Sequence, residues 1–315
     1  MTARIRIGIS SCLIGQEVRY DGGHKHNEYI TQSLGQFFEF VPYCPEVAIG
    51  LGVPRPTIRL VKVGHTVRAQ GVKDSSLDVT DRLVAYADKV APRLHSISGY
   101  ILKKNSPSCG MERVKLYTAK GMPAGTTSGL YAGRLLALHP EMPFEEEGRL
   151  MDPVLRENFI ERVWIYHRWQ QLVSRRLSPK GLVAFHTRHK FIVLAHDEKS
   201  YRELGRLVAE AGKGATPELG QRYVRLLMQA LKKPATRTRH ANVLQHVAGF
   251  FKKHLDAEDK IELQDVITNY RRGQVPLVVP ITLIRHYLRR YPDAYLADQH
   301  YLAPHPDELM LRNQI

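Results

Sequence analysis

The stretch SGYILKKNSPSCG, residues 98–110, runs from a short apolar segment into a polar turn that contains proline and reaches a cysteine. Its apolar part has the composition of a β-strand, and the Ser and Pro residues that follow are typical of a turn. The chain has only three cysteines in 315 residues. A cysteine placed at a turn just past a strand therefore needs a chemical explanation as well as a packing one.

The first part of the chain, up to about residue 135, alternates predicted strands with helical patterns. The clearest helix is DVTDRLVAYADKVAPRL, residues 78–94, which opens on an Asp/Thr capping signal. Strands that alternate with helices favour a mostly parallel sheet covered on both faces, in a Rossmann-like α/β domain. The predicted strands are RIRIGIS (4–10), FFEFVPY (37–43), IRLVKVG (58–64) and GYILKK (99–104).

The pattern changes near residue 150. HPEMPFEEEGRLMDP, residues 139–153, combines proline, glycine and an acidic run without any period, and this is typical of a linker. From residue 154 the apolar residues recur at helical spacing, beginning with VLRENFIERVWIYHRWQQLVSRRL. We therefore predict an α/β domain over residues 1–145, followed by an all-α domain over residues 154–315.

Composition and charge narrow the class of protein. A hydrophobic content of 43% and a charged content of 24% are those of a soluble globular chain. No apolar run approaches the roughly 18 residues that a membrane span needs, and the start MTARIRIGIS lacks the apolar region of a signal peptide, so we expect a cytoplasmic protein. The net charge is +15, of which +10 lies beyond residue 150. Such an excess suggests a polyanion partner, with a solvated basic surface as the alternative.

Each cysteine comes just after a predicted strand. Cys12 follows RIRIGIS, Cys44 follows FFEFVPY, and Cys109 lies a few residues beyond GYILKK. The carboxyl ends of parallel strands share one edge of a sheet, where ligands bind, so the three thiols could converge there. The alternative is that each is a small buried hydrophobe. The spacing is not CxxC, and soft thiolates select iron–sulfur clusters, zinc or Cu(I).

Three motifs together, GISSCLIGQEVRYDGG, PYCPEVAIGLGVPRP and LKKNSPSCG, resemble the thiouracil desulfidase family. The helical part, with FHTRHKFIVLAHDEKSY and RHANVLQHVAGFFKKHL, is similar to the YbgA-like domain, and the combination resembles the tRNA 4-thiouridine desulfidases. The resemblance implies a [4Fe-4S] cluster on Cys12, Cys44 and Cys109. Its one open iron would take sulfur from a thiolated uracil, with no net electron transfer.

Replacing C=S by C=O also requires a base that deprotonates water. Glu46, two residues after Cys44, is the first candidate, and the alternative is a solvated residue at a helix start. Ser106 could position the pyrimidine or the water and Ser108 could bond a cluster sulfur, although serine also caps turns. Asp21 could be catalytic or a turn residue. Arg55 could meet a phosphate or form a loop salt bridge, and the Gly-rich segment 127–133 is a weak phosphate cradle.

The helical half offers further candidates. His186, His189 and His196 share a helix face and could hold a metal, but packing or RNA-backbone contacts explain them better. Basic segments that interleave aromatic residues with Arg and Lys suggest RNA binding, with solvated helix faces as the alternative. These segments are KKPATRTRH (232–240), FFKKHL (250–255) and YRRG (270–273).

The leading hypothesis is an iron–sulfur desulfidase that acts on 4-thiouridine in tRNA, with the helical domain binding the RNA. One alternative keeps the enzyme but has a free thiouracil or thiouridine nucleotide as the substrate. Another is a nucleic-acid-binding redox sensor that carries a cluster. A zinc deaminase is less favoured, because its HxE and PCxxC signature is missing.

Overall fold

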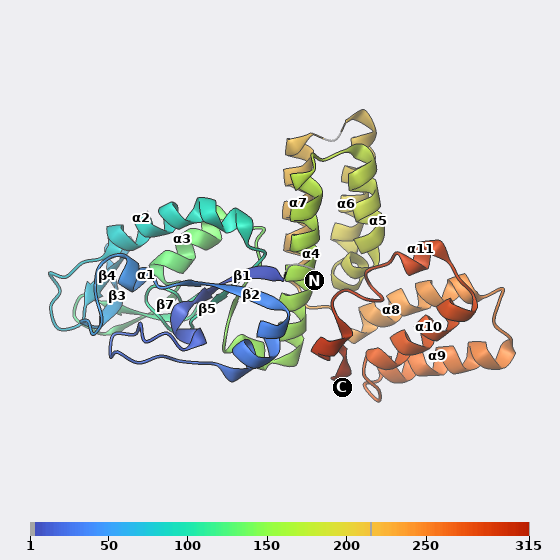
Figure 1. Ribbon diagram of the computed structural model, residues 1–315, viewed down its shortest axis with the longest axis horizontal. Helices are drawn as coiled ribbons and strands as arrows, with labels where there is room; N and C mark the ends of the chain where they lie inside the picture. The colour runs from blue at the N-terminus through green and yellow to red at the C-terminus, as the bar shows by residue number, and fades with distance from the viewer. Residues whose placement is uncertain (1–3, 215, 315) are drawn as a thin grey trace. The chain divides into compact units, whose positions relative to one another are not determined.

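The computed structural model describes residues 4–214 and 216–314 and divides the chain into two compact units, Met1–Asp152 and Pro153–Ile315 (Figure 1). The first unit is α/β and the second is helical, so the predicted fold class is confirmed. In the described part of the chain, none of the helices combines the length and the apolar character that crossing a bilayer demands.

The first unit contains an all-parallel sheet of four strands in the order β2-β1-β5-β8. Strand β1 is buried almost throughout, as expected of a parallel strand covered on both faces. Gly8 in β1 lies opposite Tyr100 in β5, and a Cβ at Gly8 would come within 2.6 Å of the Tyr100 ring. The strands are β1 (Ile5–Ser10), β2 (Phe38–Tyr43), β5 (Tyr100–Leu102) and β8 (Phe144–Glu146).

A second, mixed sheet has the order β4-β3-β6-β7. The prediction that residues 58–64 join the parallel sheet was wrong. Strand β3 turns back through Gly64 and His65 into antiparallel β4, and its other edge pairs with β6, so both of its edges are used here. The strands are β3 (Ile58–Val63), β4 (Thr66–Gly71), β6 (Val114–Thr118) and β7 (Pro123–Thr127).

Helices α2 (Thr80–Val90) and α3 (Leu130–Leu138) pack against each other beside these sheets (Figure 1). Leu83 of α2 joins the buried side chains of the second sheet, among them Leu60 and Leu116. Helix α2 lies inside the predicted range 78–94, whereas α3 was not predicted.

The segment 139–153 is not a linker. It contains β8 and a single 3₁₀ turn, η5 (Arg149–Met151), and its apolar residues Phe144 and Leu150 are buried. Its acidic run, Glu145 to Glu147, is also buried, because each carboxylate has protein partners. The acidic run of the predicted linker thus lies in, and directly after, the edge strand of the parallel sheet.

The second unit follows the helical spacing of the sequence. Several of its helices begin at a side chain that caps the first turn, such as Ser178, Thr216 and Asp256, each of which accepts a backbone N–H. The helices are α4 (Pro153–Ser174), α5 (Pro179–His196), α6 (Glu198–Glu210), α7 (Pro217–Leu231), α8 (Arg237–Ala248), α9 (Ala257–Arg271), α10 (Val278–Arg290) and α11 (Ala294–Ala297).

Candidate functional site

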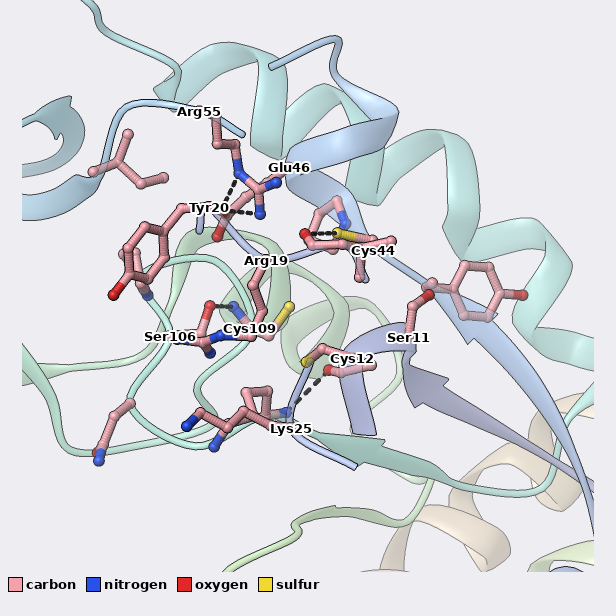
Figure 2. Close-up of a pocket in the computed structure, with 18 of the residues that line it drawn as sticks. Ser11, Cys12, Arg19, Tyr20, Lys25, Cys44, Glu46, Arg55, Ser106 and Cys109 are labelled. Carbon is pink, nitrogen blue, oxygen red and sulfur yellow. Dashed lines mark hydrogen bonds and ion pairs between the residues drawn. The ribbon is translucent and has the colours of Figure 1, made fainter. Parts of the chain in front are cut away.

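A pocket of about 360 Å³ lies at the carboxyl ends of β1, β2 and β5, which are neighbours in the parallel sheet. All three cysteines line it. Cys12 follows β1 in a 3₁₀ turn, Cys44 follows β2 directly and precedes the short helix α1 (Pro45–Ala48), and Cys109 lies in the loop after β5. Figure 2 shows their sulfur atoms gathered around one part of the pocket. The strand order thus brings together residues that are far apart in the sequence.

The thiols are shielded from water. Cys12 and Cys109 are buried and Cys44 is half-buried. Burial raises the pKa of Cys12 to about 11, although the charge of Lys103 opposes this rise, and burial also raises the pKa of Cys44 and that of Cys109. Without a cationic ligand these groups are neutral thiols at pH 7, so they are poor nucleophiles by themselves.

The segment after Cys12 folds back over the strand ends. The Lys25 N–H donates to the Cys12 carbonyl at 2.8 Å, and the Cys44 thiol donates to the Val18 carbonyl at 3.7 Å. Asp21 lies at an exposed turn of this segment, where its carboxylate accepts the Gly23 N–H at 3.1 Å, and it does not line the pocket. The bond from Gly23 lowers the pKa of Asp21. The structure therefore gives Asp21 the geometry of a turn residue.

Glu46, on the first turn of α1, lines the pocket beside Arg55 (Figure 2), and its carboxylate is held from two sides. Arg55 donates to Oε2 through Nε at 2.8 Å and approaches the same oxygen through Nη2 at 2.7 Å. The Ser108 hydroxyl donates to Oε1 at 2.8 Å. Arg55 thus forms the loop salt bridge that was one of its two expected roles, and its side chain is only 4% exposed.

Ser106 organises the loop that carries Cys109. Its Oγ accepts the N–H groups of Ser108 at 3.2 Å and Cys109 at 3.0 Å, which is the turn-capping role of serine. Ser106 also lines the pocket, so its hydroxyl stands beside the space a substrate would fill. Ser108 is fully buried, and its hydroxyl donates a hydrogen bond to Glu46. The expected bond from Ser108 to a cluster sulfur therefore has a competing acceptor.

The Gly-rich segment 127–133 forms the start of α3, and it braces the Cys109 loop. The N–H groups of Gly129, Leu130 and Ala132 donate to carbonyls of Gly110, Pro107 and Ser108 at 2.8, 3.1 and 3.0 Å. Gly129 is required here, because a Cβ would lie 2.6 Å from the carbonyl carbon and oxygen of Ser108. These amides are occupied by protein, so the segment is not a phosphate cradle.

Two further features of the site were not identified from the sequence: one lines the pocket, and the other holds the loop that carries Cys109. Lys103, at the end of β5, lines the pocket and forms a buried ion pair with Glu147. Glu146 accepts the Met111 N–H at 2.8 Å, and burial raises the pKa of this carboxyl against the effect of that bond. The sequence feature that could have revealed these residues is the EEE run after Phe144. Three consecutive acidic residues are normally solvated, so this run was interpreted as part of a linker.

The first unit resembles known proteins in sequence. A family model described as 2-thiouracil desulfurase matches residues 7–147. The Uncharacterized protein YbbK of Bacillus subtilis (strain 168) is 35% identical over 133 residues, covering 40% of this chain and 87% of that protein. The chain belongs to the 2-thiouracil desulfurase family.

The second unit has relatives of its own. A family model described as protein of unknown function (DUF1722) matches residues 190–306. The Uncharacterized protein YbgA of Escherichia coli (strain K12) is 35% identical over 153 residues, covering 48% of this chain and 90% of that protein. The chain thus joins a 2-thiouracil desulfurase domain to a YbgA-like domain, as the resemblance implied.

A solved structure of a [4Fe-4S]-dependent thiouracil desulfidase, TudS, is 28% identical to this chain. The match covers 47% of this chain and 95% of the TudS chain, with a TM-score of 0.36.

The histidines of the YbgA-like unit belong to its core. His186 is bonded to the Tyr223 hydroxyl at 3.2 Å, His189 to the Phe185 carbonyl at 2.7 Å, and His196 to Glu161 at 2.8 Å. All three are buried, so RNA-backbone contacts by these side chains are excluded. Burial would raise the pKa of Glu161, but the bond to His196 and the charges of His196 and Arg312 lower it to about 2.

The basic segments of this unit are only partly as expected. Lys252, Lys253, Arg271 and Arg272 are exposed, and Lys233 is exposed too but forms an ion pair with Asp197. The aromatic residues are mostly inside: Phe251 and Tyr270 are buried, while Phe250 is 42% exposed. The surface therefore offers cations for phosphates but few aromatic rings for stacking on bases.

Proposed function

We propose that the α/β unit removes sulfur from a thiolated uracil by hydrolysis, in the pocket at the ends of β1, β2 and β5. The observation that carries this proposal is the convergence of three thiols, two of them buried and one half-buried, and one anchored carboxylate on a single pocket. Membership of the 2-thiouracil desulfurase family supports the same reaction.

The thiols fit an iron–sulfur cluster better than a single ion. In residues 4–214 and 216–314, no three His, Cys, Asp or Glu side chains are grouped closely enough to hold one metal ion, yet three thiols line one pocket. Three soft donors spread around a space of about 360 Å³ suit a polynuclear centre. We assign Cys12, Cys44 and Cys109 as its ligands. A [4Fe-4S] cluster bound by three cysteines supplies one open iron, a thiophilic Lewis acid.

The reaction exchanges the C=S of the substrate and water for C=O and hydrogen sulfide, so its atoms balance without a change of oxidation state. Glu46 accepts a proton from the attacking water and returns one to the departing sulfur. Arg55 and Ser108 hold the carboxylate from two sides and so fix the direction of its free lone pairs. Ser106 stands at the pocket wall, where its hydroxyl orients the pyrimidine or the water.

The finer proposal is that the substrate is 4-thiouridine in tRNA. Arg19, Lys25, Lys103 and Lys104 line the pocket, and such a cationic wall suits a substrate with phosphate groups rather than a free base. Residues 151–315, which include the YbgA-like unit, add a net charge of +10, with exposed cations on α9 and in the turn after α8. Both features favour a polynucleotide.

Sulfide release from purified, anaerobically reconstituted protein tests both the desulfidase reaction and the choice of tRNA as the substrate. We expect sulfide from thiolated tRNA, at a rate that falls as salt is raised, since phosphate contacts are salt-dependent. Turnover of free 2-thiouracil or of a thiouridine nucleotide alone would retain the desulfidase and reject the tRNA substrate. A protein that holds its cluster but releases no sulfide from any of these compounds would contradict the enzyme and favour a redox sensor.

A further inference from the structure

The loop between β5 and β6, residues 103–113, carries Cys109 and both candidate serines. Strand β8 lies parallel to β5 with Leu102 opposite Glu146, so Glu147 comes level with the start of this loop. The loop has no strand or helix of its own, and it owes its shape to bonds from its neighbours. Helix α3 holds the middle of the loop, as described above.

The two ends of the loop are held by consecutive carboxylates of the β8 segment. Glu147 accepts the Lys104 N–H at 2.7 Å and forms the ion pair with Lys103. Glu146 accepts the Met111 N–H at 2.8 Å. Both glutamates are 7% exposed, and a carboxylate this deeply buried is costly unless it is bonded. Their bonds to the loop compensate for that cost.

Lys103 links this arrangement to the thiols. Its backbone N–H donates to the Ser10 hydroxyl at 3.0 Å, which ties the end of β5 to the end of β1, two residues before Cys12. Lys103 lines the pocket, and its side chain is 15% exposed. The partner of Glu147 is therefore a half-buried lysine that lines the same pocket as the three thiols.

We propose that Glu146 and Glu147 are positioning residues, which fix both ends of the Cys109 loop and, through Glu147, hold the Lys103 ammonium at the pocket wall. The inference rests on the proposed function for its purpose, because a cluster needs Cys109 at a fixed place. A centre with three thiolate ligands also carries negative charge, which a held ammonium stabilises. Outer partners of this kind typically change metal affinity or activity by about 10- to 100-fold.

Glu145 provides a matched control from the same strand. It is buried like its neighbours, but its carboxylate accepts from Arg149 Nε at 2.6 Å and from the Glu146 N–H at 3.0 Å, and both of these donors lie outside the loop. Glu146→Gln, Glu147→Gln and Glu145→Gln each replace one buried carboxylate by an amide of nearly equal size. A general loss of stability should therefore appear in all three variants, and it is measured by thermal unfolding of each metal-free protein.

The first measurement needs no metal. The full-length, metal-free variants are treated with iodoacetamide, and alkylation of each cysteine is followed by peptide mass spectrometry. We expect Cys109 to react about tenfold faster or more in Glu146→Gln and Glu147→Gln than in wild type or Glu145→Gln, because loosening the loop exposes its 7% exposed thiol. Cys44 should react at an unchanged rate. Equal rates at Cys109 in all three variants would overturn the proposal.

The second measurement uses the reconstituted protein. Iron loss to a chelator should be about 10- to 100-fold faster in Glu146→Gln and Glu147→Gln than in Glu145→Gln. In Glu147→Gln, the electron paramagnetic resonance spectrum of the reduced centre should also change, because Lys103 has lost its partner. If Cys109 labelling responds as expected but the wild-type protein binds no iron, Glu146 and Glu147 still position the loop and the proposed function is wrong. If iron loss and spectra match those of Glu145→Gln, the positioning role of Glu146 and Glu147 is wrong and the proposed function is unaffected.

Discussion

Glu46→Gln separates proton transfer from the shape of the site. The amide and the carboxylate occupy nearly the same volume, so the pocket keeps its form. In the native protein Oε2 lies 2.7 Å from Arg55 Nη2, and Oε1 accepts the Ser108 hydroxyl at 2.8 Å. An amide has a single oxygen acceptor and cannot accept a proton at neutral pH, so the change removes the base and leaves Arg55 without its countercharge.

The loss of the base affects the rate, and the loss of the Arg55 countercharge affects the stability. Loss of general base catalysis should lower kcat by about 10²–10⁴-fold. Removing one partner of a buried ion pair can cost about 3–5 kcal/mol, and Arg55 is only 4% exposed. However, the amide oxygen still accepts one N–H, and Arg55 Nη1 keeps its bond to the Gly52 carbonyl at 3.0 Å. We therefore expect a stability loss of about 1–3 kcal/mol, which a domain can tolerate.

The assay measures kcat from sulfide release at saturating substrate, with iron content and thermal unfolding on the same sample. Ser108→Ala is the control, because it removes one bond to the same carboxylate but keeps the base, and its rate should fall only about tenfold. A Glu46→Gln protein that retains full iron and turns over within tenfold of wild type would refute the assignment of Glu46 as the base.

Further predictions address the ligands, the loop, the second unit and the RNA. Serine at any one of the three cysteines should abolish both the iron and the turnover, and full iron content in any such variant would remove that cysteine from the ligand set. Gly129→Ala should lower iron content, because its Cβ would lie 2.6 Å from the neighbouring loop carbonyl, whereas Gly205→Ala, with nothing within 4 Å, should not. The pKa of Glu161 is lowered from 4.5 to about 2, so its stabilising effect is present above pH 4.5 and lost as the pH falls toward 2; Glu161→Gln should flatten the pH dependence of urea unfolding in that window. Reversing the charge of Arg271 and Arg272 together should weaken tRNA binding in gel shifts and reduce its salt dependence, without changing the iron content.

Much of the site could be predicted from the sequence because it depends on strand ends. Cys12 and Cys44 directly follow apolar runs, and the order of parallel strands then brings them to one edge. Arg55 was expected to meet a phosphate or a salt-bridge partner, and the structure selects the salt bridge to Glu46. Local patterns were therefore sufficient to place the thiols, whereas the choice between the two roles of Arg55 required the structure.

The parts that were missed depend on long-range partners. Strand β8 has three residues, two of them glutamate, and its burial depends on bonds to residues about forty positions earlier in the chain. No periodicity shows such pairing. Strand β3 was assigned to the wrong sheet for a related reason: its composition fits either sheet, and only the pairing with β4 and β6 decides.

The proposed reaction requires the three thiols to hold one cluster together. The measurement that tests this most directly is iron and acid-labile sulfide per chain in protein purified without oxygen. We predict about four of each, the content of one [4Fe-4S] centre. Less than one iron per chain after reconstitution, or iron without labile sulfide, would contradict the assignment of the pocket.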